Sequence, residues 1–177
     1  LTRILESATR LTDGEASSLL LVDPANDRLY FEISLGSKGE EVQKFSLAKG
    51  EGIAGWVFEH NRSVIVNDVS SDSRFYGEIG QKVGFSTERI LAVPMRIHND
   101  CVGVIEIINK TSGRDFDEED RQWLEIFANQ AALAIQNAKS FEQVRNEISS
   151  LQDQIVTDRG YHTFVGSSPL LREKLDL

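Results

Sequence analysis

The sequence predicts an α/β fold with a central antiparallel sheet of five to six strands and helices on both sides of it. Short apolar runs bounded by turn residues recur between residues 16 and 108, as expected for strands. Residues 117–156 contain neither Pro nor Gly and carry apolar residues at helical spacing, which indicates one long C-terminal helix. The 177 residues, 40% of them hydrophobic, suffice for one ordinary core plus an extension.

The first part of the chain begins with a helix and a strand hairpin. Residues 1–12 repeat apolar side chains at helical spacing. Residues 16–22 form a short apolar run, and residues 29–33 alternate after a turn rich in Asp and Asn, which predicts two paired strands. A further short strand is expected through Val42 and Phe45.

The second part of the sheet follows a short helix, which we expect at Ile53–His60, and a brief strand at Ser63–Val66. Residues 67–88 are polar and irregular, and a segment of that length inside a compact domain is usually functional or mobile. Two strands, at 90–97 and 102–108, complete the sheet. We expect the first and last helices on one face and a pocket on the other, capped by the short helices and the irregular segment.

The long helix carries an apolar 4-3 spacing for more than four heptads, which is the pattern of a coiled-coil seam. A second apolar row is confined to its first half, where we expect the helix to pack on the sheet as well; it comprises Leu124, Ala128, Ala131, Leu133 and Ile135. The alternative is a helix that covers its own sheet throughout. We favour a parallel homodimer, because polar residues flank the later seam. The expected interface residues are Leu1, Leu5, Phe127, Ala134, Phe141, Val144, Ile148 and Leu151.

Composition excludes several classes of function. The net charge is −9 and no Lys/Arg cluster is present, so this part of the protein is not expected to bind nucleic acid. No run of ~18 apolar residues exists, so no membrane helix is expected. The single cysteine, Cys101, fits a reducing compartment. The chain starts at Leu1 rather than Met, and we interpret it as a piece of a larger cytoplasmic protein.

Four segments together resemble the GAF domain family. Residues 17–23 (SSLLLVD) resemble its first strand, and residues 50–57 (GEGIAGWV) resemble its glycine-rich helix entry. Residues 91–95 (LAVPM) and 102–110 (VGVIEIINK) resemble its paired central strands. The resemblance covers roughly the first 140 residues, and it implies a sensory domain without catalytic activity of its own.

A further motif is similar to the GAF domains of cyclic-nucleotide phosphodiesterases and adenylyl cyclases. Asn109-Lys110, Phe116 and Asp120 match the family's Asn-Lys-Phe-Asp-Glu signature, whose final Glu is Arg121 here. The resemblance implies that the Lys and Asp form a bridge that supports the pocket and performs no chemistry. These four matching residues are therefore expected to be pocket-supporting.

The same resemblance implies a pocket for a cyclic nucleotide, cAMP or cGMP. Backbone amides at a helix start can hold a phosphate without a formal cation, and aromatic side chains can sandwich a purine. Where the related phosphodiesterases have Phe-Asp before a glycine, this sequence has Ser34 and Leu35 before Gly36. The lining residues carried over by position are Ser18, Ala54, Phe75, Tyr76, Ile79, Val83, Thr87 and Glu106.

The tail carries a second resemblance. Residues 164–171 (FVGSSPLL) resemble the opening of the AAA+ domain of sigma-54-dependent transcription activators. This implies a GAF sensory domain at 1–139, a coiled-coil linker at 140–158 and the start of a truncated ATPase at 159–177. Contacts with sigma-54 RNA polymerase and DNA would then use domains beyond this chain, and no ATP-binding loop is present to hydrolyse ATP.

No enzymatic reaction is predicted. His60, His98 and His162 lie in separate segments without metal-ligand spacing, so neither a metal nor a catalytic site is expected. Two alternatives to a cyclic-nucleotide sensor stay open. One is a dimerisation or protein-interaction module without a small ligand. The other is a sensor of a metabolite such as 2-oxoglutarate, for whose carboxylates Arg89 and Lys82 are the nearby cations.

Overall fold

The structure is a computed structural model that describes residues 1–158. It contains two compact units, Leu1–Asn137 and the residues from Ala138 onward. The ATPase start expected at 159–177 lies outside the described residues. None of the helices that the structure describes is both long enough and apolar enough to cross a membrane.

Short helices and strands are interspersed along the chain before the long final helix. The helices are α1 (Thr2–Leu11), α2 (Gly39–Val42), α3 (Gly52–His60), the short 3-10 helix η1 (Val69–Ser71), α4 (Glu78–Val83) and α5 (Glu118–Asp158). The strands are β1 (Gly14–Asp23), β2 (Arg28–Leu35), β3 (Ser46–Ala48), β4 (Val64–Val66), β5 (Ile90–Ile97) and β6 (Asp100–Lys110).

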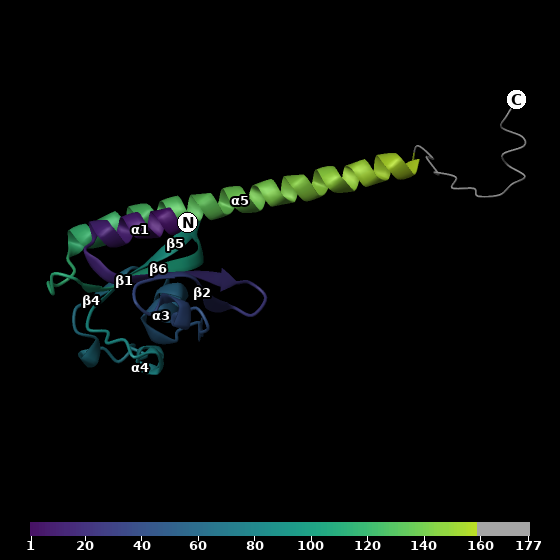
Figure 1. The fold of residues 1–177 in the computed structure, drawn as a ribbon. Helices are drawn as coiled ribbons and strands as arrows, with labels where there is room; N and C mark the ends of the chain where they lie inside the picture. Colours follow the sequence, from purple (N-terminus) through teal and green to yellow (C-terminus); the bar gives the residue numbers. More distant parts are fainter. Residues whose placement is uncertain (159–177) are drawn as a thin grey trace, which may run out of the picture. The chain divides into compact units, whose positions relative to one another are not determined.

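The six strands within residues 1–158 form one sheet, in the order β3-β2-β1-β6-β5-β4. Every neighbouring pair is antiparallel. The hairpin β5–β6 and the pair β1–β6 make up the middle of the sheet (Figure 1). The predicted fold, with its central antiparallel sheet and long C-terminal helix, is confirmed.

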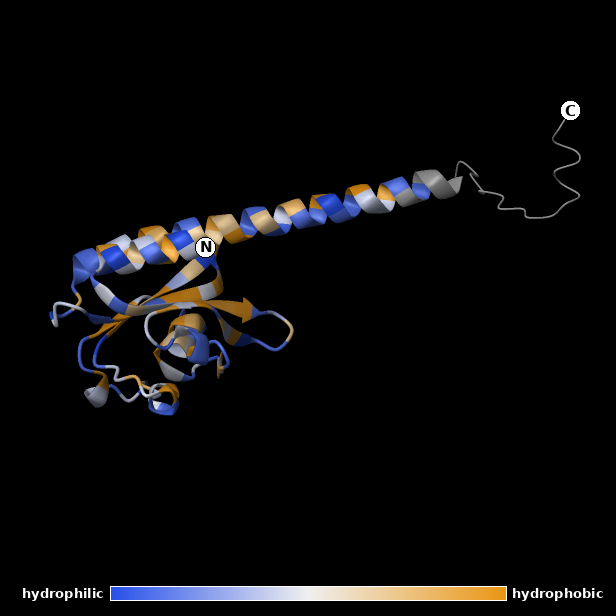
Figure 2. Ribbon diagram, viewed as in Figure 1, coloured by the Kyte–Doolittle hydropathy of each residue, from blue (hydrophilic) through white to orange (hydrophobic). Residues whose placement is uncertain are grey.

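Separate hydrophobic cores lie on the two faces of the sheet. One core joins α1 and the first part of α5 to Leu91, Val93, Ile105 and Ile107. The other joins α3 to residues that alternate with these in β5 and β6, such as Ala92. Successive side chains of a strand point to opposite faces, so a strand covered on both sides must be apolar throughout. In Figure 2 the strands β5 and β6 are accordingly coloured mostly as hydrophobic.

The chain between β2 and β3 differs from the prediction. We expected a strand through Val42 and Phe45, but residues 39–42 form α2 and the strand β3 begins only at Ser46. The backbone turns at Gly36, which has φ +117°, a conformation that favours glycine. The irregular segment 67–88 also contains more structure than expected, namely η1 and α4.

Two apolar side chains lie elsewhere than predicted. Leu133 was assigned to the row that packs on the sheet, but its exposed fraction is 58%. It lies about 200° around the helix from Ala131, which is fully buried, so it points the opposite way. Leu5 was assigned to the dimer interface. It is 0% exposed and packs in the core of its own chain, so it has no surface to offer a partner.

Candidate functional site

A pocket lies on the face of the sheet opposite α1, between the strands, α3 and the segment that contains α4. The cavity volume is about 100 Å³, which is below the ~300–1,000 Å³ typical of small-molecule sites. All eight residues predicted to line a pocket contact this one cavity. They are Ser18, Ala54, Phe75, Tyr76, Ile79, Val83, Thr87 and Glu106.

The floor of the pocket carries a polar row in an otherwise apolar sheet. Ser18 of β1 pairs in register with Ser34 of β2 on one side and with Glu106 of β6 on the other. All three side chains line the cavity. The Ser18 hydroxyl donates to the Ser34 hydroxyl over 3.3 Å. Three neighbouring strands therefore present hydroxyl, hydroxyl and carboxyl groups side by side.

Glu106 is buried among apolar neighbours, with an exposed fraction of 7%. It has this position because β6 alternates: Ile105 and Ile107 face the helix side, so the residue between them faces the cavity. Burial raises the pKa of its carboxyl from 4.5 to about 7, because the charged form loses its hydration. Near neutral pH this carboxyl is therefore divided between its neutral and ionised forms.

The start of α3 forms another part of the pocket. Gly52, the first residue of α3, has φ +70° and lines the cavity beside Ile53 and Ala54. Within the described residues no side chain caps this helix end, so its first amide groups are open to an acceptor. A Cβ at Gly55 would lie 2.6 Å from the Ala48 carbonyl oxygen, so glycine is required for α3 to pack this closely against β3.

Aromatic side chains make up much of the remaining wall. Phe75 and Tyr76 come from the segment before α4, Phe31 from β2 and Phe85 from the residues after α4. Tyr76 is 36% exposed, and a hydrogen bond to Glu78 raises the pKa of its hydroxyl. The walls can therefore bury a flat apolar or aromatic ligand, while the polar row contacts one of its edges.

The cations near the pocket are not those that the sequence suggested. Neither Arg89 nor Lys82 lines the cavity. Arg89 pairs with Asp115 and Glu88 instead, and Lys82 pairs with Glu78. Lys38 lines the cavity, with its ammonium 3.7 Å from the Glu41 carboxylate. Sequence reasoning missed Lys38 because it did not recognise α2, which brings this residue to the pocket.

Asn109 fastens the segment that carries Thr87. It adopts φ +52°, and its side-chain oxygen accepts from the backbone amides of Glu88 and Arg89 over 2.9 and 3.1 Å. Its side-chain amide donates to the Ser86 carbonyl and to the Glu15 carboxylate, over 3.0 and 2.9 Å. One side chain thus ties the pocket edge to β1 and β6.

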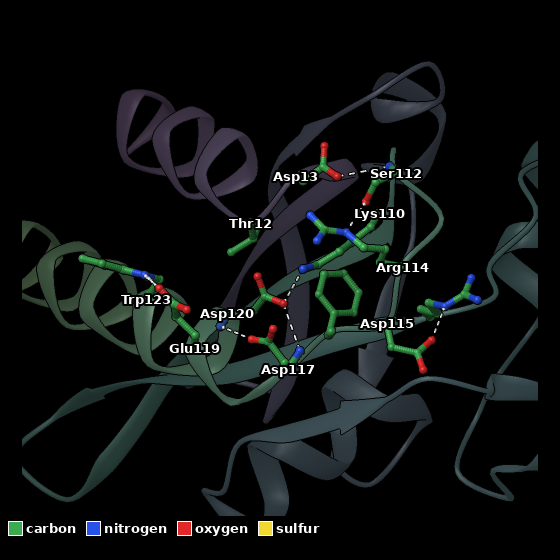
Figure 3. Close-up of polar contacts among 12 residues, drawn as sticks. Thr12, Asp13, Lys110, Ser112, Arg114, Asp115, Asp117, Glu119, Asp120 and Trp123 are labelled. Carbon is green, nitrogen blue, oxygen red and sulfur yellow. Dashed lines mark hydrogen bonds and ion pairs between the residues drawn. The ribbon is translucent and has the colours of Figure 1, made fainter.

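Lys110 and Asp120 form a buried ion pair between the end of β6 and the first turn of α5. The ammonium lies 2.5 Å from the carboxylate, and the two side chains are 7% and 11% exposed. Asp120 also accepts from the Asp117 backbone amide, and Asp117 accepts from the Asp120 amide in return (Figure 3). This reciprocal arrangement is a helix cap of the capping-box type. The bond from the Asp120 amide holds the pKa of Asp117 below its usual value.

Phe116 completes this cluster. It is 3% exposed, and the Lys110 ammonium lies 5.5 Å from the centre of its ring. Its backbone exchanges two hydrogen bonds with the Asn67 side chain, each 2.9 Å long. None of the four predicted pocket-supporting residues lines the cavity. They lie around the junction of β6 with α5, where they can fix the position of pocket elements.

Comparison with known proteins places the chain in a family. The family model described as GAF domain matches residues 1–136. The chain belongs to the GAF domain family. GAF domains are regulatory modules that bind small ligands and commonly dimerise.

The GAF domain has relatives among cyclic-nucleotide phosphodiesterases. A probable 3′,5′-cyclic phosphodiesterase of Caenorhabditis elegans is 30% identical over 154 residues, covering 81% of this chain and 21% of that protein. A cGMP-specific 3′,5′-cyclic phosphodiesterase of Drosophila mojavensis is 38% identical over 153 residues, covering 79% and 14%. The chain therefore spans about a fifth or less of the length of these relatives.

Solved structures share the fold. The GAF domain of an Acinetobacter phosphoenolpyruvate-protein phosphotransferase superposes with a TM-score of 0.67 at 24% identity, covering 79% of this chain and 82% of that one. The second GAF domain of DevS from Mycobacterium smegmatis gives 0.64 at 20% identity, covering 80% and 94%. At these identities the likeness concerns the fold alone.

A second candidate site is the apolar stripe on α5, which we define as Phe141, Val144, Ile148 and Leu151. These side chains are exposed by 77, 54, 51 and 52%. Of the other predicted interface residues, Leu1 is 37% exposed, and Phe127 and Ala134 are half-buried. In the first part of α5, Ile126 and Leu133 are exposed as well, by 47 and 58%. Ile126 lies seven residues before Leu133, so the two side chains fall on the same exposed face of the helix.

Replacing Asp120 by Ala should destabilise the domain by about 3–5 kcal/mol, because it leaves the buried Lys110 ammonium without a counter-charge. Urea unfolding measures this, with Glu119→Gln in the same helical turn as an exposed control that should change stability by less than ~0.5 kcal/mol. The double variant Lys110→Met/Asp120→Leu should regain most of the loss, because it leaves no buried charge. A cost of Asp120→Ala below about 1 kcal/mol, as for an exposed pair, would contradict this assignment.

The buried carboxyl of Glu106 should make stability depend on pH. Its pKa is about 7 in the folded domain and near 4.5 when exposed, so its stabilising contribution is complete below about pH 4.5 and is lost as the pH rises through 7. Relative to Glu106→Gln, the wild-type free energy of unfolding should fall by ~2.5 kcal/mol between about pH 5 and pH 8. Urea unfolding at both pH values measures this. The exposed Glu32→Gln should show no such change, and a constant difference for Glu106→Gln would refute the assignment.

Proposed function

We propose that this GAF domain binds a cyclic nucleotide, cAMP or cGMP, and passes the binding signal on through a dimeric α5. The observation that carries the proposal is the composition of one cavity. An uncapped helix start, aromatic walls and a polar row surround the same space. These are the three contacts that a phosphate, a purine face and a purine edge require.

A nucleotide would occupy the pocket in the following way. Its cyclic phosphate would accept hydrogen bonds from the first amides of α3, near Gly52, where the helix dipole favours negative charge. Its purine would lie against Phe75 and Tyr76. The edge of the base would then face the row of Ser34, Ser18 and Glu106.

The relatives of the chain support this class of ligand. They include cGMP-specific phosphodiesterases and dual cAMP and cGMP phosphodiesterases. A dicarboxylate such as 2-oxoglutarate receives less support from the geometry. It needs positive charge for two carboxylates, and Lys38 is the cation that the described residues place at the cavity.

The path from the pocket to α5 is short. Glu106, Asn109 and Lys110 follow one another along β6. The first lines the cavity, the second holds the segment beside Thr87, and the third pairs with Asp120 at the start of α5. A ligand that favours one arrangement of this strand would therefore shift the start of the helix. That is a two-state coupling, driven by the difference in ligand affinity between the states.

The readout would be a homodimer formed through α5. The stripe from Phe141 to Leu151 leaves four large apolar side chains more than half exposed in a single chain. Seven-residue spacing of such residues is what pairs two helices, and a solvated single helix of this kind gains little stability alone. A dimerisation module without a small ligand is the second candidate function, and this stripe is the observation that favours it.

The wider protein would be a cytoplasmic sigma-54-dependent transcription activator. The support is the sequence of residues 164–171, which is similar to the start of the ATPase domain of such activators, and its place after a sensory domain and a helix. In that arrangement residues 1–139 sense the ligand, residues 140–158 connect, and the ATPase begins at 159. DNA and sigma-54 RNA polymerase would be contacted by domains beyond this chain.

Cyclic nucleotide should stabilise the domain and bind with one site per chain. At 100 times its dissociation constant, a ligand adds about 2.7 kcal/mol to the stability of the protein that binds it. Thermal-shift and calorimetric titrations with cAMP and cGMP measure both effects. Thr87→Ala should weaken them, because Thr87 lines the cavity, whereas Thr2→Ala on the exposed start of α1 should not. No response to either nucleotide near ~1 mM would leave the dimerisation module as the function.

Phe141→Asp should convert the dimer to a monomer. It places a charge in the middle of the apolar seam, where like charges from two chains would meet without water. Sedimentation equilibrium measures the change in mass. Gln143→Asp adds the same charge to the same helical turn outside the stripe and should leave the dimer intact. If Phe141→Asp and the wild type have the same mass in solution, the chain does not dimerise through this seam.

A further inference from the structure

Glu106 differs from the other titratable groups at the pocket. The cavity lining contains three of them within the described residues: Lys38, Tyr76 and Glu106. Lys38 pairs with Glu41, and the Tyr76 hydroxyl is bonded to Glu78 near the surface. Glu106 lies on the floor, where its register partners are Ser18 and Ala92. It faces a hydroxyl and a methyl group from the flanking strands rather than a charge.

We propose that Glu106 selects the purine base by its protonation state, so that the same pocket prefers cAMP when this carboxyl is neutral and cGMP when it is ionised. This inference rests on the proposed function, since it assigns the base preference of the cyclic-nucleotide site. It makes Glu106 a specificity-determining residue and makes the response of the domain depend on pH as well as on nucleotide.

The two bases present opposite hydrogen-bonding edges. The pairing edge of guanine offers two neighbouring N–H donors, which suit an ionised carboxylate because that group only accepts. The pairing edge of adenine offers one acceptor nitrogen next to an amino donor. A neutral carboxylic acid matches this edge with its O–H donor and its carbonyl acceptor. A carboxylate facing adenine, or a neutral acid facing guanine, leaves a buried polar group unpaired, which strongly disfavours binding.

The hydroxyls beside Glu106 permit both pairings. Ser18 and Ser34 can each donate or accept by rotating the hydroxyl hydrogen, so neither residue commits the row to one base. Their bond is 3.3 Å long, which is weak enough to exchange for a bond to ligand. The carboxyl is therefore the member of the row whose donor count changes with pH.

Charges from the surrounding elements do not fix this carboxyl in one form. Facing it across the pocket, α3 contributes Ala54, and α4 contributes Ile79 and Val83. Lys38 lines the cavity and Lys110 ends β6, and each of these cations has its own acidic partner. Burial is the cause that moves the pKa of Glu106 to about 7, so both forms are populated near neutral pH.

The test is a calorimetric titration of the wild-type chain with cAMP and with cGMP at about pH 6 and pH 8. A group with a pKa of about 7 is roughly nine-tenths neutral at the lower pH and one-tenth at the higher. Because apparent affinity scales with the competent fraction, cAMP should bind about tenfold more weakly at pH 8, and cGMP about tenfold more tightly. Near pH 7, titrations in two buffers of different ionisation enthalpy should show proton uptake with cAMP and proton release with cGMP.

Glu106→Gln separates the charge from the shape of the side chain. Its amide offers one acceptor and a donor, like the neutral acid, so the variant should keep cAMP affinity, lose the tight cGMP binding at pH 8 and show no pH dependence. Glu32→Gln removes an exposed carboxylate from β2 and should preserve the wild-type pattern.

The possible results distinguish the base switch at Glu106 from cyclic-nucleotide binding itself. Binding of either nucleotide with an affinity ratio that does not change between pH 6 and pH 8 would overturn the base switch and leave the cyclic-nucleotide site in place. Absence of binding for both nucleotides at both pH values would overturn both. If Glu106→Gln does not fold, the proton counts of the wild-type chain decide the question, since a value of zero for both nucleotides also overturns the switch.

Discussion

The burial of β6 on both faces is the constraint on which the rest of the domain depends. This strand pairs with β1 and β5, and it is covered on one face by α1 and α5 and lines the pocket with the other. Because side chains alternate along a strand, each residue of β6 belongs either to the helix side or to the pocket side. A shift of one residue would exchange Ile105 or Ile107 with Glu106, and a carboxyl would then enter a dry core.

The pocket is a polar site built at a cost to the core. A buried carboxyl without a cationic partner is destabilising relative to an apolar side chain, particularly when it is ionised. The polar groups that the sheet presents to the pocket lie together in one row, Ser34, Ser18 and Glu106. Aromatic side chains line the cavity around this row. Such a site is most readily understood as one that a polar ligand edge completes.

The junction between β6 and α5 connects the pocket side of the sheet to the long helix. Separating the partners of a buried ion pair is unfavourable, because each charge is then left unpaired away from water. Lys110 and Asp120 therefore make the start of α5 follow the end of β6. Asn109 adds the segment around Thr87 to the same junction through four hydrogen bonds. The four residues predicted to support the pocket thus lie around this junction and do not line the cavity.

The sequence by itself determined the fold class and most strand positions, because alternation, helical spacing and turn chemistry are local signals. The residues around the cavity came from the resemblance to the GAF family, carried over by position. It failed at α2, where a short polar segment has no periodicity and Lys38 reaches the pocket only through the turn at Gly36. Tertiary structure alone decided that Leu5 belongs to the core and Leu133 to the surface, since spacing identifies a helix face but not what covers it. It also decided the pKa of Glu106, because desolvation depends on every element that excludes water from the carboxyl.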